Sequence, residues 1–243
     1  MKIVFHPKFY IPYTSDPAAQ AGRMEAIVAE LRDFEFVEPE MAIKEDILLV
    51  HTEMHYEYVK SDEDVFDVAM LAAGGAIKAA KIAFTEPAFA LIRPPGHHAS
   101  PESSWGFCYF NNIAIAVKKL FFEQKISRAV IVDFDLHFGD GTANTFRGDE
   151  RVQYHHMSGG DIDGVADFLR KNYYDIIAVS AGFDKHKEDW GGLLETEDYK
   201  ELGKIIKEFS EQKCFGRRFA ALEGGYNHRV LGKNVRAFIE GMD

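Results

Sequence analysis

Two histidines stand side by side in the segment RPPGHHA, residues 93–99, directly after an apolar, strand-like run. Neighbouring side chains on an extended backbone point to opposite sides, so we expect His97 and His98 to have different partners. The two prolines and the glycine before them predict a stiff turn that allows close backbone approach. Because the unperturbed pKa of histidine is about 6.5, either ring could serve as a general acid or base.

A carboxylate and an imidazole share one face in the segment DFDLHFGD, residues 133–140. Asp135 and His137 lie two residues apart, so on an extended backbone they point the same way and could bind one metal ion. Asp184, in the later segment SAGFD, is a candidate third ligand. Three protein ligands with one open position are typical of catalytic zinc, whereas structural zinc has four. The alternative for the pair alone is a helix cap at Asp135 and an ordinary loop histidine.

Two further carboxylates and a tyrosine could complete this chemistry. Asp133 and Asp140 lie close to the candidate ligands and could each fix the tautomer of one histidine. Tyr226 follows two glycines, and its phenol could donate to a carbonyl oxygen that gains negative charge. An ordinary turn tyrosine is equally compatible with this pattern. The segment GFCYFNN, residues 106–112, could line a narrow apolar passage or pack in the core, with Cys108 as a small buried side chain.

Strands that alternate with helices must position these residues. Short runs rich in β-branched or aromatic residues predict strands that begin at Lys2, Ala88, Ala129, Val152, Ile176 and Arg218. Helical patterns cover about residues 18–31, 65–84, 112–124, 165–172, 198–211 and 231–240. The alternation predicts a single α/β domain over residues 1–243, with an open, mostly parallel sheet flanked by helices on both faces. The predicted strands that begin at Ala88, Ala129, Ile176 and Arg218 each end next to one of the polar segments described above. These four polar clusters should meet at one edge of the sheet, because ligands bind at the carboxyl ends of parallel strands.

Composition excludes several classes of protein. Of 243 residues, 47% are hydrophobic, which is enough for a large core. A formal net charge of -11 argues against a nucleic-acid binder and is compatible with cationic partners. No stretch is long and apolar enough to cross a membrane, and the first residues lack the pattern of a signal peptide. Two cysteines do not support a disulfide scaffold or a cysteine-based zinc site, so a cytoplasmic location is expected.

Five ordered motifs give the sequence a family resemblance. RPPGHHA, GFCYFNN, IVDFDLHFGDGT, SAGFD and ALEGGYN follow one another between residues 93 and 227, and VHTEMHYEYVKS precedes them at residues 50–61. In this order they resemble histone deacetylases and acetylpolyamine amidohydrolases. The resemblance implies the open α/β fold shared with arginases, one catalytic divalent ion, usually zinc, and hydrolysis of an acetylated amine to acetate and the free amine. The substrate would be an acetyl-lysine side chain or a small acetylated polyamine.

The resemblance also assigns roles to the motif residues. It implies that Asp135, His137 and Asp184 bind zinc. It makes His98 the general base that later protonates the amine, with Asp140 behind it.

In the same way His97 is the electrostatic partner of His98, with Asp133 behind it, and Tyr226 polarises the acetyl carbonyl. Gly106 and Phe107 would line the substrate tunnel, with Gly225 among the substrate-binding residues. A potassium ion near the zinc, held largely by backbone oxygens of residues 133–137, is also expected.

The sequence departs from the family pattern in several places. Phe138 stands where relatives usually have a second histidine. Because that histidine does not bind zinc in the relatives, we expect the replacement to leave catalysis intact. The segment DPAAQAGRMEAI follows the N-terminal pattern only loosely, and Gln20 replaces an arginine, so the cavity behind the metal should differ. Between Tyr154 and Asp184 the chain is short, and the loop that brings a second tunnel aromatic is reduced to HHMSGGDIDG. The acidic loop residue that grips the substrate backbone in relatives is not identifiable near residues 61–64, so we expect a wider or shallower mouth.

Two other functions fit parts of the pattern. A ureohydrolase of the same fold would hold two manganese ions, but Phe138 and Gly139 follow His137, and Lys185 and His186 follow Asp184, where extra carboxylates would be needed. A module that binds acylated lysine without turnover is the non-enzymatic alternative. The sequence leaves the substrate and the oligomeric state open, although an oligomer could narrow the mouth.

Overall fold

Seven parallel strands form one central sheet in the computed structural model, which describes residues 1–243. Their order across the sheet is β2-β1-β3-β7-β6-β4-β5, and every neighbouring pair is parallel. The strands are β1 (Lys2–Val4), β2 (Glu35–Val37), β3 (Ala88–Ala90), β4 (Ala129–Asp133), β5 (Val152–His156), β6 (Ile177–Ala181) and β7 (Arg218–Leu222). The predicted α/β class with a parallel sheet is therefore confirmed.

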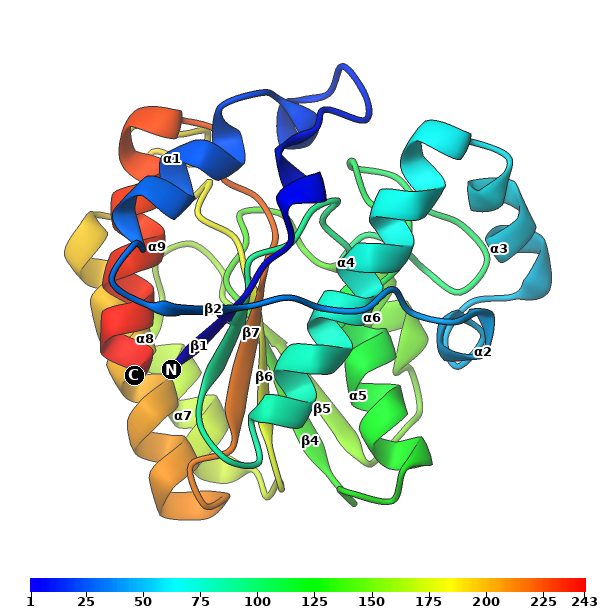
Figure 1. Ribbon diagram of the computed structural model, residues 1–243. Helices are drawn as coiled ribbons and strands as arrows, with labels where there is room; N and C mark the ends of the chain where they lie inside the picture. Colours follow the sequence, from blue (N-terminus) through cyan, green and yellow to red (C-terminus); the bar gives the residue numbers. More distant parts are fainter.

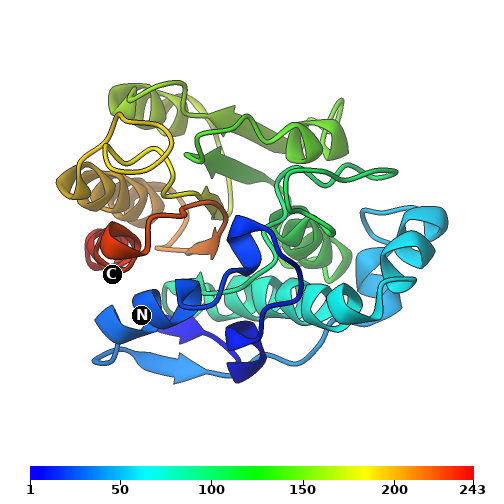
Figure 2. The same ribbon diagram turned by 90° about the horizontal axis from the view of Figure 1, so that it is seen from above.

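Helices cover both faces of this sheet, as Figures 1 and 2 show. One layer consists of α1 (Arg23–Glu30), α7 (Ile162–Lys171), α8 (Thr196–Lys213) and α9 (His228–Met242). The other layer is built around α4 (Glu63–Ile82) and α5 (Asn112–Phe122), and it also contains α2 (Lys44–Ile47), α3 (Glu53–Lys60) and α6 (Asp140–Thr145). None of these helices has both the length and the apolar composition that a membrane crossing requires.

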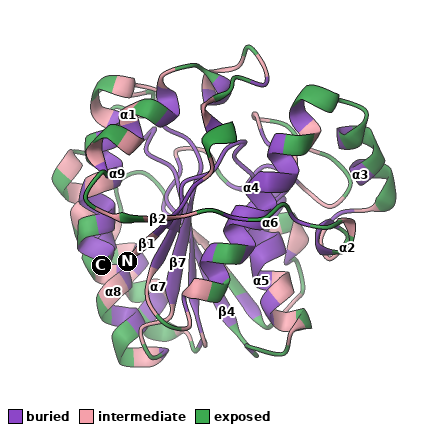
Figure 3. Ribbon diagram, viewed as in Figure 1, coloured by how far each residue is buried: buried purple, intermediate pink, exposed green.

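The central strands are buried on both faces, which explains their sequences. Every residue of β3, β4, β6 and β7 is buried, as the colouring in Figure 3 shows for the middle of the sheet. Strands covered by helices on both faces have continuous apolar runs instead of alternating ones. The aromatic side chains of Phe134 and Phe238, 5.0 Å apart between ring centroids, join the sheet to α9. A rigid core thus lies directly beneath the carboxyl ends of the strands.

Several predicted elements need correction. The predicted helix over residues 18–31 is a short 3-10 turn (Pro17–Ala19) followed by α1, because Gly22 has a φ of 86° and interrupts the helix. Another 3-10 turn, Pro7–Tyr10, follows β1. Sequence analysis missed β2, an edge strand of only three residues, and it missed α2, α3 and α6. These elements are too short for a hydrophobic period to be recognised.

The strand order brings the four polar clusters together. β3, β7, β6 and β4 are consecutive in the sheet, although they are widely separated in the chain. Because all four run in one direction, the loops after them leave from the same edge. The histidine pair, the two aspartate segments and the Gly-Gly-Tyr segment therefore face a common space.

Candidate metal centre

Asp135, His137 and Asp184 converge at this edge of the sheet. Each offers a ligand atom, and the three atoms lie within 4.8 Å of one another. The Nδ1 atom of His137 is 3.3 Å from Oδ1 of Asp135 and 3.3 Å from Oδ2 of Asp184. The two carboxylates are buried, whereas the imidazole is partly exposed. The geometric condition for one shared ion is met by the three residues that sequence analysis selected.

The electrostatics of this group favour a cation. Burial and the charge of Asp135 raise the pKa of Asp184, while the nearby carboxylates of Asp135 and Asp184 raise the pKa of His137 to about 10. Asp184 Oδ1 accepts the Leu136 N–H at 2.9 Å, but its buried Oδ2 has no hydrogen-bond partner. Two buried carboxylates are costly without a compensating positive charge. The donor set and the unpartnered oxygen fit a divalent ion.

Two glycines give these carboxylates their space. Asp135 Oδ2 accepts the Gly224 N–H at 2.8 Å, so the loop after β7 orients the carboxylate. A Cβ at Gly182 would lie 2.1 Å from Asp135 Oδ2, and one at Gly224 would lie 2.7 Å from Asp184 Oδ2. The backbone after β6 and β7 therefore passes so close to the site that no side chain fits there.

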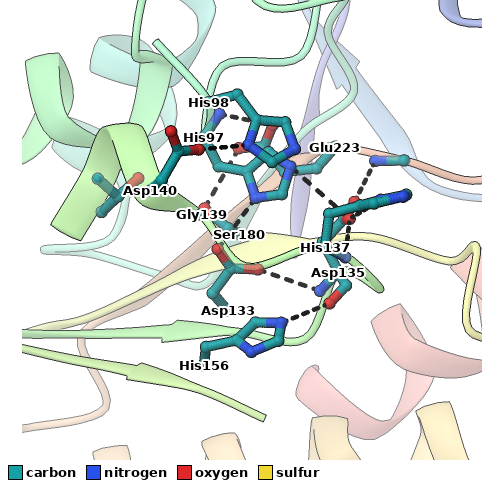
Figure 4. Close-up of polar contacts among 12 residues, drawn as sticks. His97, His98, Asp133, Asp135, His137, Gly139, Asp140, His156, Ser180 and Glu223 are labelled. Carbon is teal, nitrogen blue, oxygen red and sulfur yellow. Dashed lines mark hydrogen bonds and ion pairs between the residues drawn. The ribbon is translucent and has the colours of Figure 1, made fainter. Parts of the chain in front are cut away.

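His98 is paired with Asp140, as Figure 4 shows. Its Nδ1 lies 2.6 Å from Asp140 Oδ1, and Oδ2 of the same carboxylate accepts the Trp105 Nε1–H at 2.9 Å. The Trp105 ring also lies against the imidazole, with 4.0 Å between ring centroids. Donation from Nδ1–H to Asp140 leaves Nε2 without a proton. Burial and the neighbouring His97 lower the pKa of His98 despite Asp140, which keeps the ring neutral near pH 7.

His97 has a separate and more buried partner. Its Nδ1 is 3.1 Å from Asp133 Oδ2, and its Nε2 is 3.6 Å from Asp135 Oδ1. Burial opposes a charge on His97, but the two aspartates outweigh it and raise the pKa of His97 well above its usual value. The Tyr154 hydroxyl donates to Asp133 Oδ2 at 2.9 Å, a contact that sequence analysis missed. As expected, the two histidines have different carboxylate partners.

Glu223 fixes the turn that carries both histidines. Its Oε2 accepts the N–H groups of Gly96 at 2.7 Å and His97 at 3.2 Å, and Oε1 accepts the Ser180 hydroxyl at 3.2 Å. Burial raises the pKa of Glu223 to about 7 although His97 opposes the shift. The segments after β3 and β7 are thereby joined to β6. Glu223 belongs to the ALEGGYN motif, but nothing in the sequence indicates this role.

The loop that carries Tyr226 is fixed from two sides. Asp189 Oδ2 accepts the N–H groups of Tyr226 and Asn227, both at 2.8 Å. The buried Arg23 donates from Nε to the Gly225 carbonyl at 2.8 Å. Gly225 has a φ of 117°, so a residue with a side chain would be strained at this position. Burial raises the pKa of Tyr226, so its hydroxyl stays protonated.

The sequence matches the family described as "Histone deacetylase domain" over residues 17–160 and 165–242. The chain belongs to the histone deacetylase family. It is 31% identical to a "Probable deacetylase" of Methanothermobacter thermautotrophicus over 308 aligned residues, which cover 100% of this chain and 91% of the relative. A "Probable deacetylase" of Archaeoglobus fulgidus is 34% identical, with 93% and 81% covered.

A solved structure supports the fold of this deacetylase family member. The crystal structure of the HDA15 HD domain superimposes with a TM-score of 0.87 at 23% identity and covers 100% of this chain and 90% of that domain. The deacetylase fold that the motifs implied is confirmed. The family match is interrupted at residues 161–164, within the segment that sequence analysis described as shortened.

The mouth of the site is lined by both tryptophans of the chain. A pocket of about 130 Å³ lies between Trp105, Trp190, Phe107 and Tyr226, with His98 and His137 among its other lining residues. Trp190 stacks on Tyr226 with 4.1 Å between ring centroids, and Phe107 is 6.0 Å from the same ring. The shortened loop after Tyr154 predicts a wider or shallower mouth, but Trp190, from the loop after Asp184, supplies a second aromatic wall.

Gly106 and Phe107 line this pocket, and their role toward a substrate stays a prediction. Gly106 has a φ of 60°, and a Cβ there would lie 2.5 Å from Cδ2 of His98. The backbone before the pocket therefore packs directly on the imidazole. Cys108 is buried, as expected, and Phe138 is exposed at the surface.

Proposed function

We propose that this chain is a zinc-dependent hydrolase that removes an acetyl group from an acetylated amine. The observation that carries the proposal is the convergence of Asp135, His137 and Asp184 within 4.8 Å of one another, beside two histidines that each have their own carboxylate. The family and the printed names of the archaeal relatives support the same reaction class.

Asp135, His137 and Asp184 would hold the ion, and a set of two carboxylates and one imidazole suits zinc with a position left open. When bound, a divalent ion there would act as a Lewis acid that polarises the acetyl carbonyl and acidifies an attacking water. Asp184 Oδ2 is buried, forms no hydrogen bond and lies 3.3 Å from His137 Nδ1, so a cation shared by the two residues would satisfy it. The other group of potential ligands, His97, Cys108 and Glu223, contains a single carboxylate, which disfavours the ureohydrolase alternative with two ions.

His98 would move the proton. Its Nδ1–H donates to Asp140 at 2.6 Å, so the unprotonated Nε2 is available to a reactant in the pocket. As a general base, Nε2 takes a proton from the attacking water, and as a general acid it returns that proton to the departing amine. Its lowered pKa keeps the base form populated at neutral pH.

His97 would supply fixed positive charge, because its raised pKa keeps the imidazolium protonated between Asp133 and Asp135. It holds the negative charge of the buried carboxylates without exchanging protons with the substrate. The Tyr226 hydroxyl remains protonated and would donate to the carbonyl oxygen as negative charge develops there.

The substrate would present its acetylated end through the aromatic mouth formed by Trp105, Trp190 and Phe107. Such walls suit a slender aliphatic chain, which acetyl-lysine and acetylated polyamines share. The net charge of -11 suits a cationic amine of either kind. Gly106 would contribute by keeping the backbone close to the passage. Gly225, which the resemblance counts among the substrate-binding residues, does not line the pocket, because Gly224 takes that place and Gly225 packs toward Leu231 and Phe183.

The test is hydrolysis of an acetyl-lysine peptide and of an acetylated polyamine by the same preparation. Chelation should abolish the release of acetate, and added zinc should restore it. The rates on the two substrates then identify the physiological class. Full hydrolysis after complete removal of divalent ions would contradict the proposal, as would absence of turnover on every acyl amine, which would favour a binding module.

A further inference from the structure

The potassium ion that the family resemblance implied does not fit the segment at residues 133–137. The carbonyl oxygen of Asp133 accepts the Met157 N–H at 2.8 Å. The carbonyl oxygen of Asp135 accepts the Nε2–H of His156 at 2.9 Å, a contact drawn in Figure 4. The carbonyl oxygens of Asp133 and Asp135 thus already have donors from β5 and the residue that follows it.

A charged side chain lies at the same place. Lys185 is 1% exposed, and its ammonium group donates to the carbonyl oxygen of Met157, the residue whose N–H binds Asp133. Lysine is almost never fully buried without a compensating negative charge. Burial lowers the pKa of Lys185, and the negative charges of Asp133, Asp135 and Asp184 oppose that shift. No carboxylate forms a direct ion pair with Lys185, so its positive charge acts on all three carboxylates together.

The backbone of Lys185 is fixed, which prevents the side chain from leaving the interior. Its carbonyl oxygen accepts the N–H groups of Leu193 at 3.0 Å and Leu194 at 2.9 Å. The chain folds back so closely that a Cβ at Gly191 would lie 2.7 Å from the Cα of Lys185. The loop after Asp184 therefore places an ammonium group as firmly as the sheet places the carboxylates.

We propose that Lys185 is a built-in monovalent cation, which together with His156 takes the place of potassium beside the metal centre. It is a positioning residue, because it acts on the Asp133–Asp135 segment and not on the substrate. The proposal rests on the proposed function only in treating Asp135 and Asp184 as ligands. It makes the structure of the centre independent of potassium.

The first test compares the unmodified protein in potassium chloride and in tetramethylammonium chloride at equal ionic strength. The Tm and the affinity for zinc should be the same in the two salts, and potassium should show no saturable binding. A saturable rise in Tm or in zinc affinity with potassium would overturn the proposal. Because neither measurement uses hydrolysis, an inactive but salt-indifferent protein would refute the proposed function alone.

The second test replaces Lys185 with an uncharged side chain of similar length. Breaking a buried charge arrangement should lower the Tm of Lys185→Met by roughly 6–20 °C in tetramethylammonium chloride. Potassium should restore part of that loss, since the site now lacks its own cation. Lys233→Met, on the exposed side of α9, is the matched control and should change neither property. A Lys185→Met protein with unchanged Tm and no response to potassium would contradict the proposal, and if this variant does not fold, the first test still decides.

Discussion

Asp140→Asn should disable His98, because the asparagine side chain has one acceptor oxygen where the aspartate has two. Asp140 accepts two N–H donors on two different oxygens, from His98 at 2.6 Å and from Trp105 at 2.9 Å. Asparagine has one acceptor oxygen and one donor group. If the oxygen serves Trp105, the amide N–H2 faces Nδ1 of His98 and forces the proton onto Nε2, where the base must be free.

The expected cost is the contribution of the general base. We predict that kcat/KM falls by about 10²–10⁴-fold, which corresponds to roughly 2.7–5.4 kcal/mol of transition-state stabilisation. The carboxylate also raises the pKa of His98 against burial and His97, so its loss lowers that pKa further. The acid limb of the remaining activity should therefore move to lower pH.

A second variant tests the acceptor argument itself. Trp105→Phe keeps a ring over His98 but removes the competing N–H, so in the double variant the asparagine oxygen can turn to His98. Activity of Asp140→Asn/Trp105→Phe should exceed that of Asp140→Asn, a non-additive result expected only for coupled residues. The assay is a pH profile of acetyl-lysine hydrolysis, with zinc content as the control for folding of the centre. A single variant within a few-fold of the unmodified protein, or a double variant with no recovery, would refute the reasoning.

Three further variants test other parts of the site. Tyr226→Phe should lower kcat by about 10²–10³-fold with little change in KM, because the donor acts on charge that develops in the transition state; an equal effect on KM alone would contradict this role. Gly182→Ala places a methyl group 2.1 Å from Asp135 Oδ2, so zinc affinity, measured by competition with a chelator, should fall at least about tenfold. Trp190→Ala should raise KM by roughly 2–12-fold, because an aromatic contact contributes about 0.5–1.5 kcal/mol. Trp190→Phe keeps an aromatic ring and should therefore have a KM close to that of the unmodified protein.

The sequence predicts the part of this site that local rules govern. Asp135 and His137 share a face because of their spacing, and buried parallel strands deliver Asp184 and Tyr226 to the same edge. The pairing of His97 with Asp133 and of His98 with Asp140 also agrees with the structure. Their roles in catalysis stay predictions, as do the single catalytic domain over residues 1–243 and the cytoplasmic location.

The remaining contacts depend on distances in space that no local pattern encodes. Arg23 reaches the Gly225 carbonyl across 202 positions of sequence, and Tyr154 reaches Asp133 from the neighbouring strand. Lys185 directly follows a candidate ligand, but nothing in its surroundings predicts that its ammonium is buried. Trp105 and Trp190 offered one usable signal, since the only two tryptophans of the chain stand directly before the GFCYFNN motif and six residues after Asp184.

The most direct measurement is the number of divalent ions bound per chain, determined by elemental analysis of the unmodified protein and of Asp184→Asn. We predict one tightly bound ion in the unmodified protein, and we predict that Asp184→Asn loses both the ion and the hydrolysis of acetyl-lysine. Two ions per chain, or full activity in a variant that retains no metal, would contradict the account.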